Sequence, residues 1–172
     1  AARSILGSAH SIMTPQVILD RVRIVLCRTS HPGNIGAAAR AMKTMGLSRL
    51  YLVQPLCAVD EVATARAAGA DDVLAEAAVC GSLAEALAGC VHAAALSARL
   101  RDLGPVAVGV REAVGPMLAQ TAVGDVALVF GNETSGLSNE ELQCCQQAVT
   151  IPSNPGYSSL NLGAAVQVMA YE

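Results

Sequence analysis

The feature that most limits the fold of this sequence is a set of short apolar runs without polar alternation. Val22–Cys27 and Asp125–Phe130 are nearly continuous apolar runs, and stretches of helical pattern separate them. A strand that is apolar on both sides needs cover on both faces, which is typical of a parallel sheet flanked by helices. A chain of 172 residues is long enough to bury such a core in one domain. The sequence therefore predicts an α/β fold, a parallel sheet with helices on both faces.

Apolar runs and turn residues predict the individual elements. Strands are expected at 22–27, 49–53, 91–96, 125–130 and 148–151, and helices at 35–45, 61–68, 83–88, 114–120, 138–147 and 160–172. Asn34 is the predicted N-cap of the first helix and Gly46 its end, while Ser138 and Glu141 form a predicted capping box. Residues 1–16 show no periodicity and are interpreted as a disordered leader or an expression scar. Residues 17–172 are then one domain.

Composition excludes several classes of protein. No uninterrupted apolar run approaches the roughly 18 residues of a membrane span. The six cysteines include no Cys-x-x-Cys pair, so neither a zinc site nor any other metal is expected. Without a signal peptide, the interpretation is a reduced, cytoplasmic protein with no disulfide-linked partner and no membrane. The net charge of −3 does not by itself suggest a nucleic-acid binder.

The charge is nevertheless segregated along the chain. Residues 21–59 carry six basic residues and no acid, and residues 112–172 carry six acids and no base. Phosphate contact requires a local positive surface rather than a basic total. The sequence therefore predicts a positive surface formed by Arg21, Arg23, Arg28, Arg40, Lys43 and Arg49, which Arg99 and Arg101 extend.

Polar, glycine-rich loops follow four of the predicted strands, at 28–34, 97–101, 131–137 and 152–161. Ligands of open parallel sheets bind outside the carboxyl ends of the strands, so these loops predict a site there. The sequence contains neither the Gly-x-Gly-x-x-Gly fingerprint of dinucleotide-binding proteins nor a phosphate-binding P-loop. A nucleotide-like ligand must then be held in another way.

Three segments in order carry a family resemblance. Asn34–Arg40 (Asn-Ile-Gly-Ala-Ala-Ala-Arg), Phe130–Leu137 with its Gly-Asn-Glu and Gly-Leu, and Ser159–Asn161 resemble the motifs of the SpoU/TrmH branch of the SPOUT methyltransferases. The resemblance runs from about Arg23 to Glu172. It is closest to the bacterial TrmJ group, tRNA 2′-O-methyltransferases that act on cytidine or uridine at anticodon-loop position 32. Asn132 and Thr134 depart from that group, which often carries arginines there.

The resemblance implies a fold, a cofactor and partners. It implies a SPOUT fold with a C-terminal deep trefoil knot, a homodimer, a tRNA substrate, and bent S-adenosyl-L-methionine converted to S-adenosyl-L-homocysteine. TrmJ-type proteins carry a C-terminal extension that we expect this chain to lack. The implied cofactor-binding residues are Leu96, Ser97, Ala98, Gly131, Ile151, Ser158, Ser159 and Leu160. The expected RNA-binding residues are Arg28, Arg40, Lys43, Arg99, Arg101 and Tyr157.

The implied reaction moves a sulfonium methyl group to a ribose 2′-hydroxyl. The implied catalytic residues are Arg40, Asn34, Glu133, Ser159 and Asn161. The resemblance implies that Arg40 assists loss of the hydroxyl proton. Because a guanidinium stays protonated, we expect Arg40 to orient the ribose and to stabilise the developing alkoxide rather than to act as the base. Glu133 would fix its loop or pair with Arg40.

Several of these residues have simpler interpretations. Arg40 alone would be a solvated helix residue, and Ser159 and Asn161 could cap the last helix. Tyr157 could stack on a base or fill a turn. Other SpoU-type tRNA or rRNA methyltransferases, a non-catalytic RNA-binding module and a small-molecule Rossmann-like enzyme are the alternatives for function.

Overall fold

The computed structural model describes residues 14–97 and 107–172. Seven strands in these ranges form one sheet in the order β3-β2-β1-β6-β4-β7-β5, and every pair is parallel. This confirms the predicted parallel α/β sheet. The strands are β1 (Val22–Cys27), β2 (Arg49–Val53), β3 (Ala78–Cys80), β4 (Cys90–Leu96), β5 (Ala107–Gly109), β6 (Asp125–Phe130) and β7 (Gln147–Thr150).

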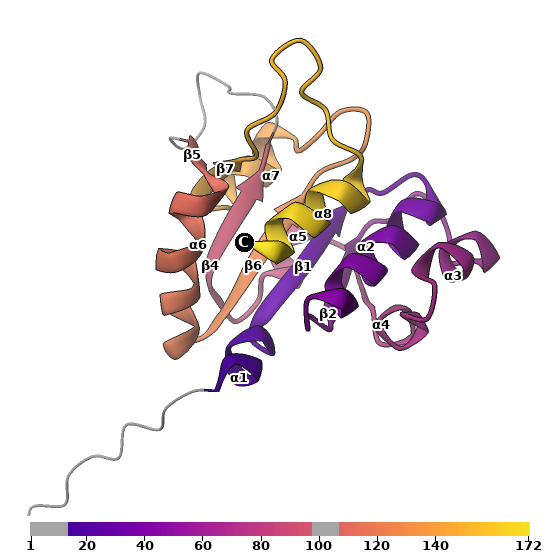
Figure 1. The fold of residues 1–172 in the computed structure, drawn as a ribbon, viewed down its shortest axis with the longest axis horizontal. Helices are drawn as coiled ribbons and strands as arrows, with labels where there is room; N and C mark the ends of the chain where they lie inside the picture. Colours follow the sequence, from indigo (N-terminus) through magenta and orange to yellow (C-terminus); the bar gives the residue numbers. More distant parts are fainter. Residues whose placement is uncertain (1–13, 98–106) are drawn as a thin grey trace, which may run out of the picture.

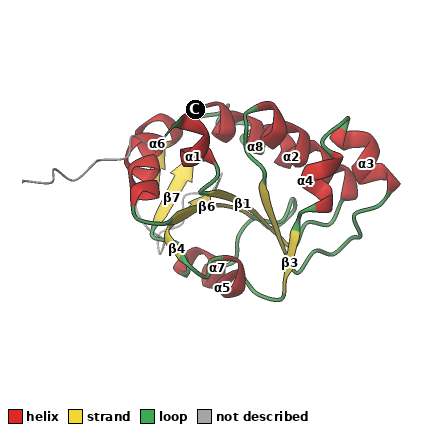
Figure 2. Ribbon diagram, turned by 90° about the horizontal axis from the view of Figure 1, so that it is seen from below, coloured by secondary structure: helices red, strands yellow, loops and turns green. Residues whose placement is uncertain are grey.

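Helices cover both faces of the sheet, as expected. Figure 2 shows α1, α2, α3, α4, α6 and α8 over one face, and α5 and α7 over the other. Their bounds are α1 (Pro15–Leu19), α2 (Pro32–Thr44), α3 (Glu61–Ala67), α4 (Asp71–Ala75), α5 (Leu83–Ala86), α6 (Val110–Ala119), α7 (Asn139–Gln143) and α8 (Leu162–Tyr171). No described helix is long and apolar enough to cross a membrane.

The two faces of the sheet bury two separate apolar clusters. Every residue of β1 is buried, because its side chains alternate between the two clusters. Ile24 joins the larger cluster with residues of α2 and α8, and Val25 joins the smaller one under α5 and α7. This explains why the central strands carry no polar alternation.

Small residues bring α2 close to both of its neighbours. A Cβ atom on Gly36 of α2 would overlap the carbonyl oxygen of Ala63 in α3. A Cβ atom on Gly163 of α8 would lie 2.6 Å from the Cβ of Ala37. The three helices therefore pack side by side, with α2 between α3 and α8 (Figure 1).

Helix α2, which corresponds to the first helix predicted from the sequence, begins earlier than expected. His31 is its N-cap, with its Nδ1 accepting a hydrogen bond of 3.2 Å from the N–H of Gly33. The prediction of Asn34 as N-cap was wrong, because Pro32 favours the first helical position and holds the preceding residue extended. Asn34 lies inside the helix. Gly46 follows the helix with φ of 79°, as expected of a residue that ends a helix.

Other differences fall on α6, which begins at Val110 instead of about Val114, and on short elements. The capping box of Ser138 and Glu141 is present, but its helix ends at Gln143 instead of about Gln147, where β7 begins pairing with β4. The sequence did not predict α4, β3 or β5, which have three to five residues each and too little pattern. Pro15 and Gln16, assigned to the leader, belong to α1. Residues 1–13 lie outside the described residues.

The position of β7 in the sheet brings the loops of the candidate site together. β7 lies between β4 and β5, although β4 and β5 follow one another along the chain. The C-terminal segment is therefore inserted between two earlier strands before it continues into α8 (Figure 1). Because β4, β6 and β7 are parallel, the loops after them meet at one edge of the sheet.

Candidate active site

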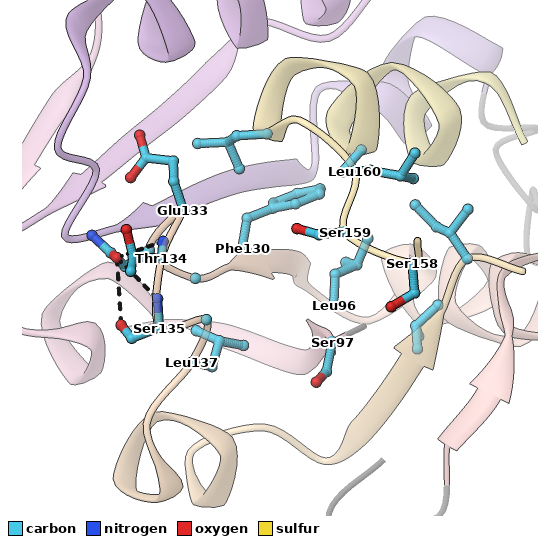
Figure 3. A pocket seen from close by; sticks show the side chains of 17 residues that line it. Leu96, Ser97, Phe130, Glu133, Thr134, Ser135, Leu137, Ser158, Ser159 and Leu160 are labelled. Carbon is cyan, nitrogen blue, oxygen red and sulfur yellow. Dashed lines mark hydrogen bonds between the residues drawn. The ribbon is translucent and has the colours of Figure 1, made fainter. Parts of the chain in front are cut away.

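A cavity of about 230 Å³ opens at the carboxyl ends of β4, β6 and β7. Figure 3 shows Leu96 at the end of β4 with Ser97 after it, Phe130 at the end of β6 with the following loop, and Ser158 to Leu160 before α8. Its lining residues are Leu96, Ser97, Phe130, Gly131, Asn132, Glu133, Thr134, Ser135, Gly136, Leu137, Val149, Ile151, Ser158, Ser159, Leu160, Leu162 and Ala165.

The cavity gathers seven of the eight predicted cofactor-binding residues. They are Leu96, Ser97, Gly131, Ile151, Ser158, Ser159 and Leu160. The eighth, Ala98, lies outside the described residues. The lining combines aliphatic side chains and Phe130 with serine and threonine hydroxyls, and none of the described lining residues is a lysine or arginine. Such a cavity suits an uncharged ring and a hydroxyl-bearing sugar better than a string of phosphates.

The loop after β6 is organised by Asn132, a residue that the sequence analysis treated only as a departure from pattern. Its Oδ1 accepts from the N–H of Thr134 (2.9 Å) and the N–H of Ser135 (3.2 Å), and its Nδ2 donates to the carbonyl of Arg28 (2.6 Å). Gly136 closes the turn with φ of 68°. The run Asn-Glu-Thr-Ser-Gly is a turn signal that could have identified this role.

Gly131 brings the two ends of the same loop together. A Cβ atom at this position would overlap the backbone of Gly136 and Leu137. The loop can close on itself only because residue 131 has no side chain. The glycine therefore shapes one wall of the cavity.

Glu133 is fixed by four donors. Its Oε2 accepts from the N–H and the hydroxyl of Ser30, both at 3.0 Å, and its Oε1 accepts from the N–H of His31 (3.3 Å) and Nδ2 of Asn34 (2.9 Å). Burial raises the pKa of Glu133, but hydrogen bonds from Asn34 and Ser30 outweigh burial and leave that pKa below its usual value. This carboxylate is an acceptor held in the charged form.

A chain of amide hydrogen bonds connects the three motifs. The Oδ1 of Asn34 accepts from Nδ2 of Asn161 at 3.0 Å, and the Oδ1 of Asn161 accepts from the N–H of Gly163 at 3.0 Å. Together with the Asn34–Glu133 bond, this chain joins α2, the loop after β6 and the start of α8. Asn161 is also the N-cap of α8, so its capping role and its place in the chain coexist.

Arg40 lies on α2, exposed to solvent and absent from the cavity lining. Its side chain makes no ion pair with Glu133, whose two oxygens are occupied by Ser30, His31 and Asn34. The suggested pairing of Glu133 with Arg40 was therefore wrong, and fixing the loop is the role that the structure supports. The fold brings Asn34, Glu133 and Asn161 together but leaves Arg40 apart from them.

Four of the six described cations in the predicted positive surface pair with acids. Arg28 forms an ion pair with Glu141 (3.0 Å), and Lys43 forms one with Asp72 (2.8 Å). Arg23 and Arg49 share one oxygen of Asp125. RNA contacts by Arg28 and Lys43 stay predictions, as does stacking on Tyr157, whose side chain is 82% exposed. Arg99 and Arg101 lie outside the described residues.

The described residues offer a binding cavity and a fixed polar framework rather than a metal centre. No group of three or more His, Cys, Asp or Glu side chains among them could hold a metal ion. The cavity can bind a flat ring with an attached sugar, and the fixed polar framework can position a second molecule beside it.

Comparison with known proteins agrees with this geometry. The SpoU rRNA Methylase family model matches residues 21–171. The tRNA (cytidine/uridine/adenosine-2′-O-)-methyltransferase TrmJ of Pseudomonas aeruginosa (strain UCBPP-PA14) is 55% identical over 156 residues, covering 90% of this chain and 61% of the relative. This chain therefore spans about three fifths of the length of that relative.

Two solved structures are also similar. TrmJ from Z. mobilis ZM4 has a TM-score of 0.81 and 38% identity, covering 87% of this chain and 66% of that one. A probable methyltransferase from Bordetella pertussis Tohama I has a TM-score of 0.84 and 46% identity, covering 91% and 95% of the two chains. With a family model that matches almost the whole chain and relatives above 50% identity, this chain belongs to the SpoU methylase family.

Proposed function

We propose that this chain transfers a methyl group from S-adenosyl-L-methionine to a ribose 2′-hydroxyl of tRNA. The observation that carries the proposal is the cavity at the ends of β4, β6 and β7, which gathers seven residues expected to contact the cofactor. The names of its relatives support tRNA as the substrate, with cytidine or uridine as the modified nucleotide. Position 32 of the anticodon loop is the expected target because the resemblance is to the TrmJ group.

The cavity residues fit S-adenosyl-L-methionine. Leu96, Phe130 and Ile151 provide apolar walls for the adenine, and Ser158 and Ser159 provide hydroxyls near its sugar. The absence of lysine and arginine from the described lining suits a cationic sulfonium. When bound, the cofactor supplies an electrophilic methyl group. The chain itself has to hold the loop of Gly131 to Leu137 in place, which Asn132 and the backbone of Gly136 do.

Arg40 is the residue that we expect to act on the RNA side. Its exposed guanidinium can orient a ribose and the adjoining phosphate, and it can stabilise negative charge on the 2′-oxygen as the hydroxyl loses its proton. A guanidinium holds its protons too strongly to be the base. Asn34, Glu133 and Asn161 are then positioning residues, while Ser159 lines the cavity directly.

We also propose a homodimer in which a second copy completes each site. Arg40 does not line the cavity of its own chain, so an arginine from a partner would supply the missing cation. The large side chains of Leu160, two residues before α8, and Tyr171, at the end of α8, are 39% and 73% exposed. Light scattering of the purified protein tests this: a mass of a single chain of 17.5 kDa would contradict it.

The inserted position of β7 supports the C-terminal deep trefoil knot of the SPOUT fold, with residues 17–172 as one catalytic domain. Single-molecule stretching from Val22 and Glu172 tests the knot. A tightened knot leaves the stretched chain shorter than its full contour length, and a chain that reaches the full length would refute the knot. A tRNA substrate and six free thiols favour the cytoplasm as the compartment.

The function is tested by transfer of tritiated methyl groups to unmodified bulk tRNA, with nucleotide mapping of the product. Arg40→Ala is expected to lower the rate at least about 100-fold, the loss typical of removing one donor to a developing oxyanion. Arg111→Ala, at an exposed arginine on α6 that does not line the cavity, is the matched control. A wild-type protein that binds no S-adenosyl-L-methionine and methylates no tRNA refutes the proposal; transfer to ribosomal RNA alone refutes its substrate.

A further inference from the structure

Two of the described cationic side chains stand out because they have no partner. In the described residues, six of the eight lysine and arginine side chains make ion pairs or hydrogen bonds; they are Arg21, Arg23, Arg28, Lys43, Arg49 and Arg111. Arg40 and Arg66 make neither with any described residue, and both are exposed. Arg40 and Arg66 are therefore the two described cationic side chains whose guanidinium donors are all free of protein partners.

The two arginines lie on neighbouring helices that meet at the glycines of α2. A Cβ atom on Gly36 would lie 2.9 Å from the Cβ of Arg66, and one on Gly33 would lie 3.4 Å from the Cγ of Arg66. The aliphatic stem of Arg66 therefore runs from α3 along the N-terminal half of α2. Arg40 follows Gly36 by four residues, and helical side chains lean back over the preceding turn. Both side chains therefore border the strip of α2 around Gly36.

This strip connects directly to the polar framework of the site. Gly33 lies two residues after His31, and the backbone N–H groups of Ser30 and His31 hold Glu133. Arg40 and Arg66 place two unpaired positive charges on neighbouring helices, and an anion that reaches both would be attracted by each of them. A phosphate is the anion that suits them, because guanidinium groups donate paired hydrogen bonds to phosphate oxygens.

We propose that Arg66 is an RNA-binding residue that contacts a phosphate of the tRNA backbone beside the nucleotide held by Arg40. This inference rests on the proposed function and names a further part of the same RNA-binding surface. Phosphate contacts fix the position and register of a nucleic acid without reading its bases. Arg66 would therefore set where the RNA lies along α2 and leave cofactor binding to the cavity.

The test measures binding of unmodified bulk tRNA to the wild type and to Arg66→Gln over a range of salt concentrations. Losing one phosphate contact is expected to reduce the slope of log affinity against log salt by about 0.7 to 0.9, which corresponds to a loss of about 5- to 8-fold at 0.1 M salt and almost none at 1 M. Arg66→Lys should retain most of the slope, because it keeps the charge. Affinity for S-adenosyl-L-methionine should be unchanged in both variants.

Arg111→Gln is the matched control, since it removes one exposed charge, 83% accessible, from α6 rather than from α3. An equal change in slope for Arg66→Gln and Arg111→Gln would overturn the inference, because it would reflect net charge alone. So would a wild type that binds and methylates tRNA beside an Arg66→Gln variant with an unchanged slope. A wild type that binds no tRNA would instead overturn the proposed function itself.

Discussion

Replacing Glu133 by glutamine tests whether this carboxylate is a fixed acceptor. The two oxygens of Glu133 accept four hydrogen bonds, from Ser30 (two), His31 and Asn34. A glutamine has one acceptor oxygen, and its NH₂ group must face donors on the other side. Asn34 cannot turn its amide to compensate, because its Oδ1 accepts from Asn161, whose own Oδ1 is held by a backbone N–H.

The loss of stability depends on how many of the four hydrogen bonds the glutamine side chain can still make. With its oxygen toward His31 and Asn34, its NH₂ faces Ser30, whose hydroxyl can rotate to accept while its backbone N–H cannot. One hydrogen bond to a charged acceptor is lost, a loss of about 1.5–3 kcal/mol when buried. Because Glu133 and Ser30 are partly exposed, we expect the free energy of unfolding to fall by about 1–2 kcal/mol at pH 7.

The pH dependence of the unfolding free energy is a second test of the role of Glu133. The pKa of Glu133 in the folded protein lies below its ordinary value of 4.5, so the stabilisation is complete above pH 4.5 and is lost as the pH falls through the folded pKa. Urea unfolding at pH 7 and at a series of pH values below 4.5 measures the gap between wild type and Glu133→Gln. The gap should shrink on acidification.

The control for this experiment is Glu140→Gln, at an exposed acid in the first turn of α7. It should change the unfolding free energy much less than Glu133→Gln does at pH 7. Equal stability of wild type and Glu133→Gln at pH 7, or a gap that widens as the pH falls, would refute the role assigned to Glu133.

Two further substitutions probe other parts of the molecule. Asp125→Asn should lower the free energy of unfolding by about 3 kcal/mol in a urea titration, because it removes the charge that pairs with Arg23 (8% exposed) and Arg49; an unchanged midpoint would contradict this. Gly131→Ala should weaken binding of S-adenosyl-L-methionine by about 5- to 150-fold in calorimetry, since overpacking costs about 1–3 kcal/mol and the loop must move. Gly115→Ala, where a Cβ meets no atom within 4 Å, should leave binding unchanged, and equal affinities of the two variants would count against the argument.

Pairing in the folded chain decides which cationic side chains of the basic segment remain free. The basic segment 21–59 does surround the first motif, yet most of its charges pair with acids from other parts of the chain, such as Asp72, Asp125 and Glu141. Arg66 lies outside that segment and has no such partner among the described residues. Local charge density therefore identified Arg40, whose side chain has no partner among the described residues, but it missed Arg66 and included cations that are paired with acids.

The sequence by itself determined the strands that form the centre of the sheet and the edge where the ligand site lies. Those features are local: an apolar run of five or six residues needs burial on both faces, and the loop that follows it has to be polar. The cavity residues Leu96, Gly131 and Ser159 were expected from the family resemblance, which itself rests on short motifs at a strand end or before the last helix.

Only the tertiary structure decided how the motifs act on one another. Glu133 bonds Asn34 across 99 residues of sequence, and Asn161 bonds Asn34 across 127. A hydrogen bond depends on distance and direction in space, and no spacing along the chain encodes which of several acids or amides will meet. The folded sheet brings these side chains together, which turns three separate motifs into one framework around the cavity.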